Sequence, residues 1–130
     1  MPVSIKRAYD KPTDRDGIRV LVDGLWPRGI TKADLKISEW EKGIAPSHPL
    51  RKWYGHDPEK WPEFRKRYCR ELEESPRKEA LDQLVGLARK GTLTLIFGAR
   101  DAERSNAAVI AELIRARLKG GGEKAVKSSE

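Results

Sequence analysis

The sequence predicts an α/β fold, a small single domain with a central, mostly parallel sheet of three or more strands flanked by helices. Two apolar runs, residues 19–25 and 92–97, have the composition and length of buried strands. The segments between them carry apolar residues at helical spacing. Strands that are separated by helices usually run parallel and are joined by a right-handed crossover.

The chain length of 130 residues is typical of one domain and is sufficient for a core without metal or disulfide support. We expect residues 1–118 to form that domain. Residues 119–130 are predicted to form a disordered tail, because the run GGGEKAVKSSE has few apolar side chains to bury.

The first half of the chain predicts two strands and short helices. Residues 3–9 alternate weakly and are expected to form a first strand, and residues 10–17 form a turn rich in Asp. After the strand at 19–25, Thr31 resembles a helix cap, and its helix is expected to reach towards Trp40. Ser47 is expected to cap a further short turn.

Two apolar stripes predict helices in the second half. The stripes comprise Trp61, Phe64, Tyr68 and Leu72, and then Ala80, Leu81, Leu84, Leu87 and Ala88. Ser75, followed by Pro76, is expected to cap the second helix, and Gly91 to end it. After the strand at 92–97, either Ser105 or Asn106 is expected to cap the last helix.

Polar side chains gather in the loops that follow the two apolar strands. The carboxyl ends of parallel strands share one edge of a sheet, which is where α/β proteins usually bind ligands. Guanidinium groups near a helix N-terminus favour an anion. We therefore predict a site for a phosphate- or carboxylate-bearing small molecule, with ligand-binding candidates Trp26, Arg28, Arg51, Arg100, Arg104 and Asn106.

Asp23 and His56 are the candidates for proton transfer in this site. Asp23 ends the strand and is a general base, a carboxylate that orients Arg28, or a structural carboxylate paired with a basic group or backbone amides. Arg28 either grips an anion in bidentate fashion, or it stacks on Trp26 or pairs with Asp23. His56 lies in the run LRKWYGHDP and either transfers protons or belongs to the start of the next helix, where Asp57 is the expected cap. Asn106 has two interpretations: it caps the last helix, or its side-chain amide contacts a ligand.

The sequence predicts no cofactor and no metal site. It contains no Walker loop, no GxGxxG and no nucleophile elbow. Two histidines and one cysteine have no spacing typical of metal ligands. Flanking arginines are expected to lower the pKa of Cys69, although its place within a helix favours a packing role.

The formal net charge of +7 favours anionic partners. A nucleic-acid-binding module, with basic residues around Trp53 and Tyr54, is therefore one alternative to the small-molecule site, and a non-catalytic protein-interaction domain is another. The single cysteine, and the lack of a signal peptide or an apolar span, predict a cytoplasmic protein that does not enter membranes. The sequence predicts neither the oligomeric state nor whether the protein is an enzyme.

Several long runs resemble the bacterial and archaeal family called domain of unknown function 488, in its short YeaO-like branch. These runs are IKRAYD, DGIRVLVDGLWPRGI, APSHPLRKWYGHDPEKWPEFRKRY and TLTLIFGARD, followed by Asn106. The resemblance covers about residues 3–118 and implies a small cytoplasmic α/β domain, without a settled activity.

The chain departs from the family pattern at two positions. The family's usual run is LVDRLWPRG, whereas Gly24 follows Asp23 here. If the family's arginine belongs to a functional site, that site is altered in this chain. Arg100 stands where the family tends to have lysine, so a covalent lysine mechanism is not expected at that position.

Overall fold

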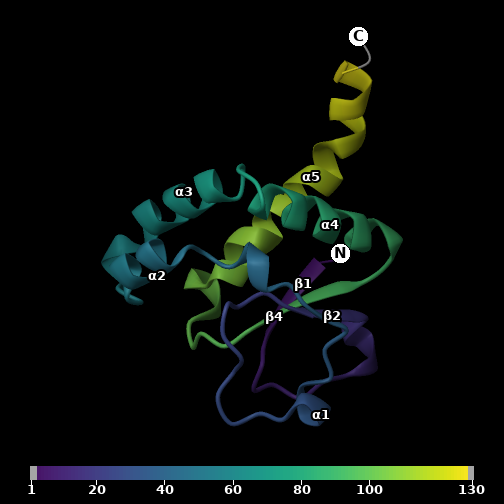
Figure 1. Cartoon of the computed structure of the whole chain (residues 1–130). Coiled ribbons are helices and arrows are strands. Elements are labelled where there is room, and N and C mark those ends of the chain that lie inside the picture. The colour runs from purple at the N-terminus through teal and green to yellow at the C-terminus, as the bar shows by residue number, and fades with distance from the viewer. Residues whose placement is uncertain (1–2, 129–130) are drawn as a thin grey trace.

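Four parallel strands form one sheet in a computed structural model that describes the backbone of residues 3–128 and the side chains of residues 3–120 (Figure 1). The strand order is β1-β4-β2-β3, and every pair is parallel. The strands are β1 (Val3–Arg7), β2 (Ile18–Leu21), β3 (Glu39–Trp40) and β4 (Leu93–Phe97). The predicted α/β fold with a mostly parallel sheet is confirmed.

Helices lie on both sides of this sheet. They are α1 (Lys32–Leu35), α2 (His48–Tyr54), α3 (Trp61–Glu71), α4 (Arg77–Lys90) and α5 (Asn106–Ser128), with short 3₁₀ turns between several of them. Figure 1 shows α3, α4 and α5 together on one side of the strands and α1 on the other. None of the helices in this part of the chain combines the length and apolarity needed to cross a bilayer. The predicted tail comprises residues 119–130, and the side chains of nearly all of these residues lie outside the described part. The tail and the domain boundary at residue 118 therefore stay predictions.

The two faces of the sheet pack into separate apolar clusters. Along β4, Leu95 and Phe97 belong to the larger cluster under α3, α4 and α5, whereas Ile96 belongs to the smaller one beside α1. This alternation is what the period of two in a strand requires. Both predicted helical stripes face the larger cluster. Within it, the buried Tyr68 hydroxyl donates to the Ile44 carbonyl at 2.6 Å, so its polar atom is satisfied.

The strand predicted at 19–25 ends earlier than expected, at Leu21. The Val22 amide still donates to the Ile96 carbonyl at 3.0 Å, but beyond it the chain turns out of the ladder. Thr31 does cap α1, accepting from the Asp34 amide, yet the helix stops at Leu35 because Lys36 adopts a left-handed φ of 51°. The expected continuation of this helix towards Trp40 was wrong, because the short edge strand β3 forms there instead.

The predictions for the start of α2 and for the two ends of α4 had mixed outcomes. Ser47 accepts from the Leu50 amide and caps α2, as expected. The predicted cap at Ser75 was wrong: Pro76 holds the N-cap position, and the Ser75 hydroxyl donates to the Glu79 carboxylate at 2.7 Å. Gly91 follows the last residue of α4, as predicted.

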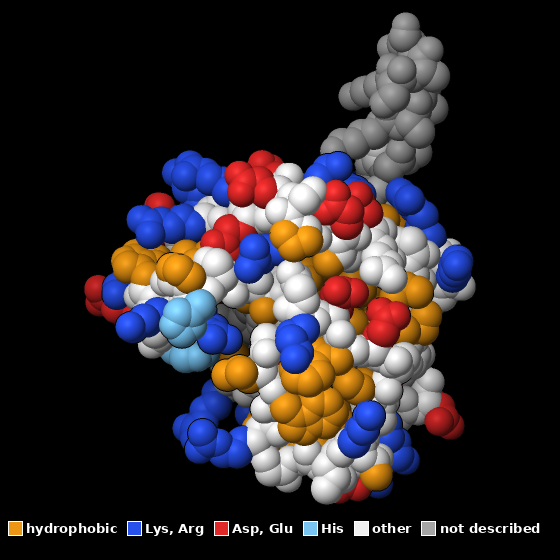
Figure 2. All heavy atoms as spheres, viewed as in Figure 1, with side chains coloured by type: hydrophobic (Ala, Val, Ile, Leu, Met, Phe, Trp, Pro, Cys, Tyr) orange, Lys and Arg blue, Asp and Glu red, His pale blue; other side chains and the backbone are white. Residues whose placement is uncertain are grey.

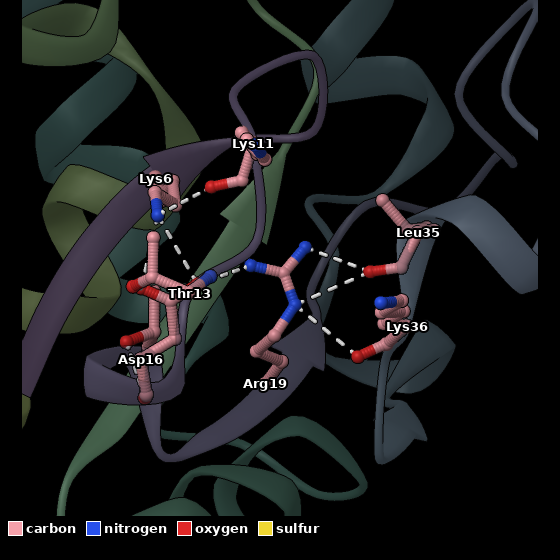
Figure 3. Close-up of polar contacts among 8 residues, drawn as sticks. Lys6, Lys11, Thr13, Asp16, Arg19, Leu35 and Lys36 are labelled. Carbon is pink, nitrogen blue, oxygen red and sulfur yellow. Dashed lines mark hydrogen bonds and ion pairs between the residues drawn. The ribbon is translucent and has the colours of Figure 1, made fainter.

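A buried ion-pair network ties the turn before β2 to the end of α1 (Figure 3). Arg19 is 4% exposed, and its guanidinium donates to Asp16 Oδ2 at 2.6 Å and to the Leu35 carbonyl at 2.7 Å. Lys6 also donates to Asp16, at 3.0 Å. Gly17 makes this turn possible, because its φ is +64° and a Cβ there would lie 2.4 Å from the Thr92 carbonyl oxygen.

The Asp16 network predicts a loss of stability at low pH. Burial raises the pKa of Asp16, but hydrogen bonds from Thr13, Lys6 and Arg19 outweigh it and hold the pKa at about 2, below its ordinary 3.8. The carboxylate therefore stabilises the fold fully above about pH 4, and this contribution is lost as the pH falls towards 2. We expect Asp16→Asn to lower the free energy of unfolding by about 2–4 kcal/mol at pH 7.

Urea unfolding of both proteins at pH 7 and pH 2.5 measures this effect. The difference between wild type and variant should shrink at the lower pH. Asp14→Asn is a matched control, because Asp14 lies exposed in the same turn. Equal stability of wild type and Asp16→Asn at pH 7 would contradict the assignment.

Candidate functional site

A pocket of about 590 Å³ lies where β2 and β4 end. The loop after β2 contributes Asp23, Gly24, Leu25 and Arg28, and the loop after β4 contributes Gly98, Ala99 and Arg104. The two loops are some 75 residues apart along the chain, yet they line the same cavity. The prediction that they open side by side at one edge of the sheet is confirmed.

The remaining wall comes from the segment before α2, from α2, from the turn after α2, from α3, and from Ser105 and Asn106 at the start of α5. The first four of these segments contribute Ala45, Pro46, Arg51, Tyr54, His56 and Phe64. Figure 2 shows the pale blue histidine side chains beside a hollow at the left of the view, with blue Lys and Arg side chains around it. Apolar walls with a few converging polar groups are typical of small-molecule sites.

Asp23 joins the two loops and carries a perturbed carboxyl. Its Oδ2 accepts from the Gly98 amide at 2.8 Å, and its backbone carbonyl accepts from the Trp40 indole at 2.7 Å. Gly98 permits this approach, because a Cβ there would lie 3.3 Å from Asp23 Oδ2. Burial raises the pKa of Asp23, against the opposing effects of Gly98, Asn106 and Arg51. Of its predicted roles, the pairing with a backbone amide is observed, and Asp23 also lines the cavity.

Asn106 does not cap the last helix. The Ser105 hydroxyl accepts from the Ala108 amide at 3.2 Å and serves as the cap. Asn106 Nδ2 donates instead to the Val22 carbonyl at 3.1 Å, and the Asn106 side chain opposes the rise in the pKa of Asp23. The amide therefore fixes the end of β2 and lines the pocket.

Three of the predicted arginines line the pocket. Arg104 pairs with Asp101 at 2.8 Å. Arg28 and Arg51 form no ion pair within the part of the chain whose side chains are described. Arg51 lies 3.4 Å from His48 Nδ1, and a Cβ on Gly24 would lie 3.4 Å from its Nη1. The pocket thus holds two guanidinium groups whose charge no carboxylate pairs with directly.

Trp26 and Arg100 do not line the pocket. The Trp26 ring packs edge-on against Trp40, with centroids 5.4 Å apart, and its indole donates to the Ile30 carbonyl at 2.7 Å. It therefore closes its own loop, and Arg28 does not stack on it. Arg100 is exposed outside the cavity.

His56 lines the pocket in a left-handed backbone conformation with φ of 60°, and its ring centroid lies 5.8 Å from that of Tyr54. The predicted cap at Asp57 is confirmed, since its side chain accepts from the Glu59 amide at 3.0 Å. Tyr54 donates to the Arg104 carbonyl at 3.2 Å and braces the wall.

The sequence did not identify several lining residues. Leu25, Ala45, Pro46 and Phe64 belong to no chemical motif, and only the folded chain brings them together. Tyr54 lies in the run LRKWYGHDP, which was the one pattern that pointed to it.

Two other predicted features have structural roles. Trp53 lies under the cations Lys60 and Arg67, at 5.1 and 4.4 Å from its ring centroid. The expected lowering of the Cys69 pKa was wrong, because partial burial in α3 raises it. Among the described residues, no group of three or more His, Cys, Asp or Glu side chains is placed to hold a metal ion.

The fold and the pocket define a small parallel α/β domain with a charged cavity at the carboxyl edge of its sheet. The chain belongs to the DUF488 family: the model described as the inactive DUF488-N3 subclade matches residues 2–130. This confirms the resemblance drawn from the sequence.

Its relatives include uncharacterised proteins from two distant bacteria. The chain is 43% identical to the uncharacterised protein Rv3073c of Mycobacterium tuberculosis over 115 residues, 88% of this chain and 95% of that protein. It is 39% identical to the uncharacterised protein YeaO of Escherichia coli over 115 residues, 88% of this chain and 98% of that protein. No solved structure matches the chain.

The raised pKa of Asp23 predicts that its charge costs stability. The folded state holds the Asp23 proton more tightly than the unfolded state, so stability falls as pH rises above the ordinary pKa of 3.8. Asp23→Asn keeps an oxygen that accepts from Gly98 and removes the charge. We expect its Tm to equal or exceed that of wild type by a few degrees at pH 7, and the difference to vanish near pH 3.

Thermal unfolding followed by circular dichroism at both pH values measures this. A variant with a markedly lower Tm than wild type at pH 7 would show that the Asp23 carboxylate stabilises the fold.

Proposed function

We propose that the pocket binds a small anionic molecule, with a phosphate or carboxylate held by Arg28 and Arg51. The observation that carries this proposal is that both guanidinium groups line one cavity without an ion-pair partner among the described side chains. A guanidinium presents a planar fork of donors that matches either anion. The N-terminus of α5 lies at the same edge and adds positive potential.

Binding is favoured over catalysis for this chain. The matching family model describes its subclade as inactive. Gly24, at the position where the family's usual run has arginine, lines the pocket beside Arg51. Asp23 and His56 both line the cavity, and under this proposal they act as hydrogen-bonding groups for the ligand.

The nucleic-acid alternative has less support from the aromatic side chains. Trp53 is already covered by Lys60 and Arg67, so its face is not free to stack on a base. Trp61 packs against the larger apolar cluster. The charge of +7 alone carries no preference for a polynucleotide.

Removing either pocket guanidinium should weaken anion binding. We expect Arg51→Ala and Arg28→Ala each to lower the affinity for phosphate-bearing ligands about tenfold or more, as for the loss of a charge-assisted hydrogen bond. The Tm should change little, since neither side chain contributes to the core. Arg51→Lys should restore only part of the affinity, because lysine lacks the planar fork.

A thermal-shift screen with sugar phosphates, nucleotides and short oligonucleotides first finds the best probe, and calorimetry then measures its affinity for each variant. Arg70→Ala is the matched control, as Arg70 is exposed on α3 away from the pocket. Equal losses in Arg70→Ala and Arg51→Ala would contradict a localised site. Oligonucleotide binding that falls steeply with salt, and that is insensitive to Arg51, would favour the nucleic-acid hypothesis.

A further inference from the structure

Asp23 has acceptor capacity left over on the cavity side. A carboxylate offers about four lone-pair positions. Within the described part of the chain, the Gly98 amide uses one of these positions, at 2.8 Å from Asp23 Oδ2. Since Asp23 lines the pocket, the remaining positions are open to a donor on a bound molecule.

The charges around the pocket decide what kind of donor this is. Arg28, Arg51 and Arg104 line the same cavity as Asp23. An ammonium group on the ligand would be repelled by Arg28 and Arg51, whereas the charge of Arg104 is paired with Asp101. A neutral hydroxyl donates to a carboxylate without that repulsion. When the ligand's hydroxyl contacts Asp23, its anionic group lies away from the Asp23 carboxylate.

The apolar walls limit the carbon skeleton of the ligand. Tyr54 and Phe64 line the pocket but are only 6% and 2% exposed, and they stack on each other with centroids 4.2 Å apart. Neither ring offers a free face to a nucleobase. Leu25, by contrast, is 67% exposed at the pocket and can cover a short aliphatic chain.

We propose that the ligand of this pocket is a hydroxylated aliphatic anion, whose phosphate or carboxylate contacts Arg28 and Arg51 while an adjacent hydroxyl donates to Asp23. The inference rests on the proposed function and adds the second recognition group. The raised pKa of Asp23 supports it, because a desolvated carboxylate gains most from a new donor.

Matched pairs of probes isolate the hydroxyl. Glycerol 3-phosphate and propyl phosphate share the anion and chain length and differ in hydroxyl groups, as do glycerate and propionate for the carboxylate. By calorimetry at pH 7, we expect the wild-type protein to bind the hydroxylated member of at least one pair about tenfold more tightly, as for a hydrogen bond to a charged group. In Asp23→Asn this ratio should fall towards one, whereas Arg70→Ala should keep it.

The outcomes distinguish the proposed anion binding from the hydroxyl contact with Asp23. Equal affinities within both pairs in the wild-type protein overturn the hydroxyl inference and leave anion binding standing. No binding of any probe overturns the proposed function and the inference with it. Binding of glycerol 3-phosphate that survives in Arg51→Ala but not in Asp23→Asn also overturns the inference, because the hydroxyl contact would then act without the anion contact. If Asp23→Asn fails to fold, the ratio of affinities within each probe pair for the wild-type protein tests the hydroxyl inference by itself.

Discussion

The parallel pairing of β2 with β4 is the constraint on which the pocket depends. Leu21 pairs with Ile96 in this ladder, so both strands end at one edge and deliver their following loops to one place. The hydrogen bond from the Gly98 amide to Asp23 then fastens the two loops together. Gly98 has no Cβ, and a side chain there would press on the carboxylate. Topology therefore brings the site together, and one glycine sets how closely its two halves approach.

Much of the fold could be predicted because its strongest determinants are local. Thr31, Ser47 and Asp57 cap helical turns through contacts two or three residues away, and the sequence pattern contains those contacts. The edge strand β3 could not be predicted in the same way. It is two residues long and is held by bonds from the Ser38 and Glu41 amides to carbonyls of β2. A strand that short has no hydrophobic period of its own, so only tertiary contacts define it.

The site residues also differ in whether local sequence or tertiary contacts determine their positions. Asp23, Arg28, Arg51 and Arg104 line the pocket because strand order and helix position place them there. Trp26 turns away because its ring packs against the ring of Trp40, fourteen positions along the chain. A strand end predicts where a loop begins. It does not predict which side chains of that loop face the cavity, since their directions depend on neighbours remote in sequence.

The arginines of this chain show how structural and ligand-directed cations differ. Arg19 is buried, and each of its guanidinium nitrogens donates to Asp16 or to a backbone carbonyl, so it faces the protein interior rather than a ligand. Arg51 is half-buried at a cavity, and its described contacts include no carboxylate. A partly desolvated guanidinium without a counter-ion is costly unless something anionic approaches it. Gly24 leaves that approach open, since a side chain at this position would begin 3.4 Å from Arg51 Nη1. Under the proposed function, Gly24 therefore leaves room for an anion beside Arg51 in this chain, whose matching family model is described as an inactive subclade.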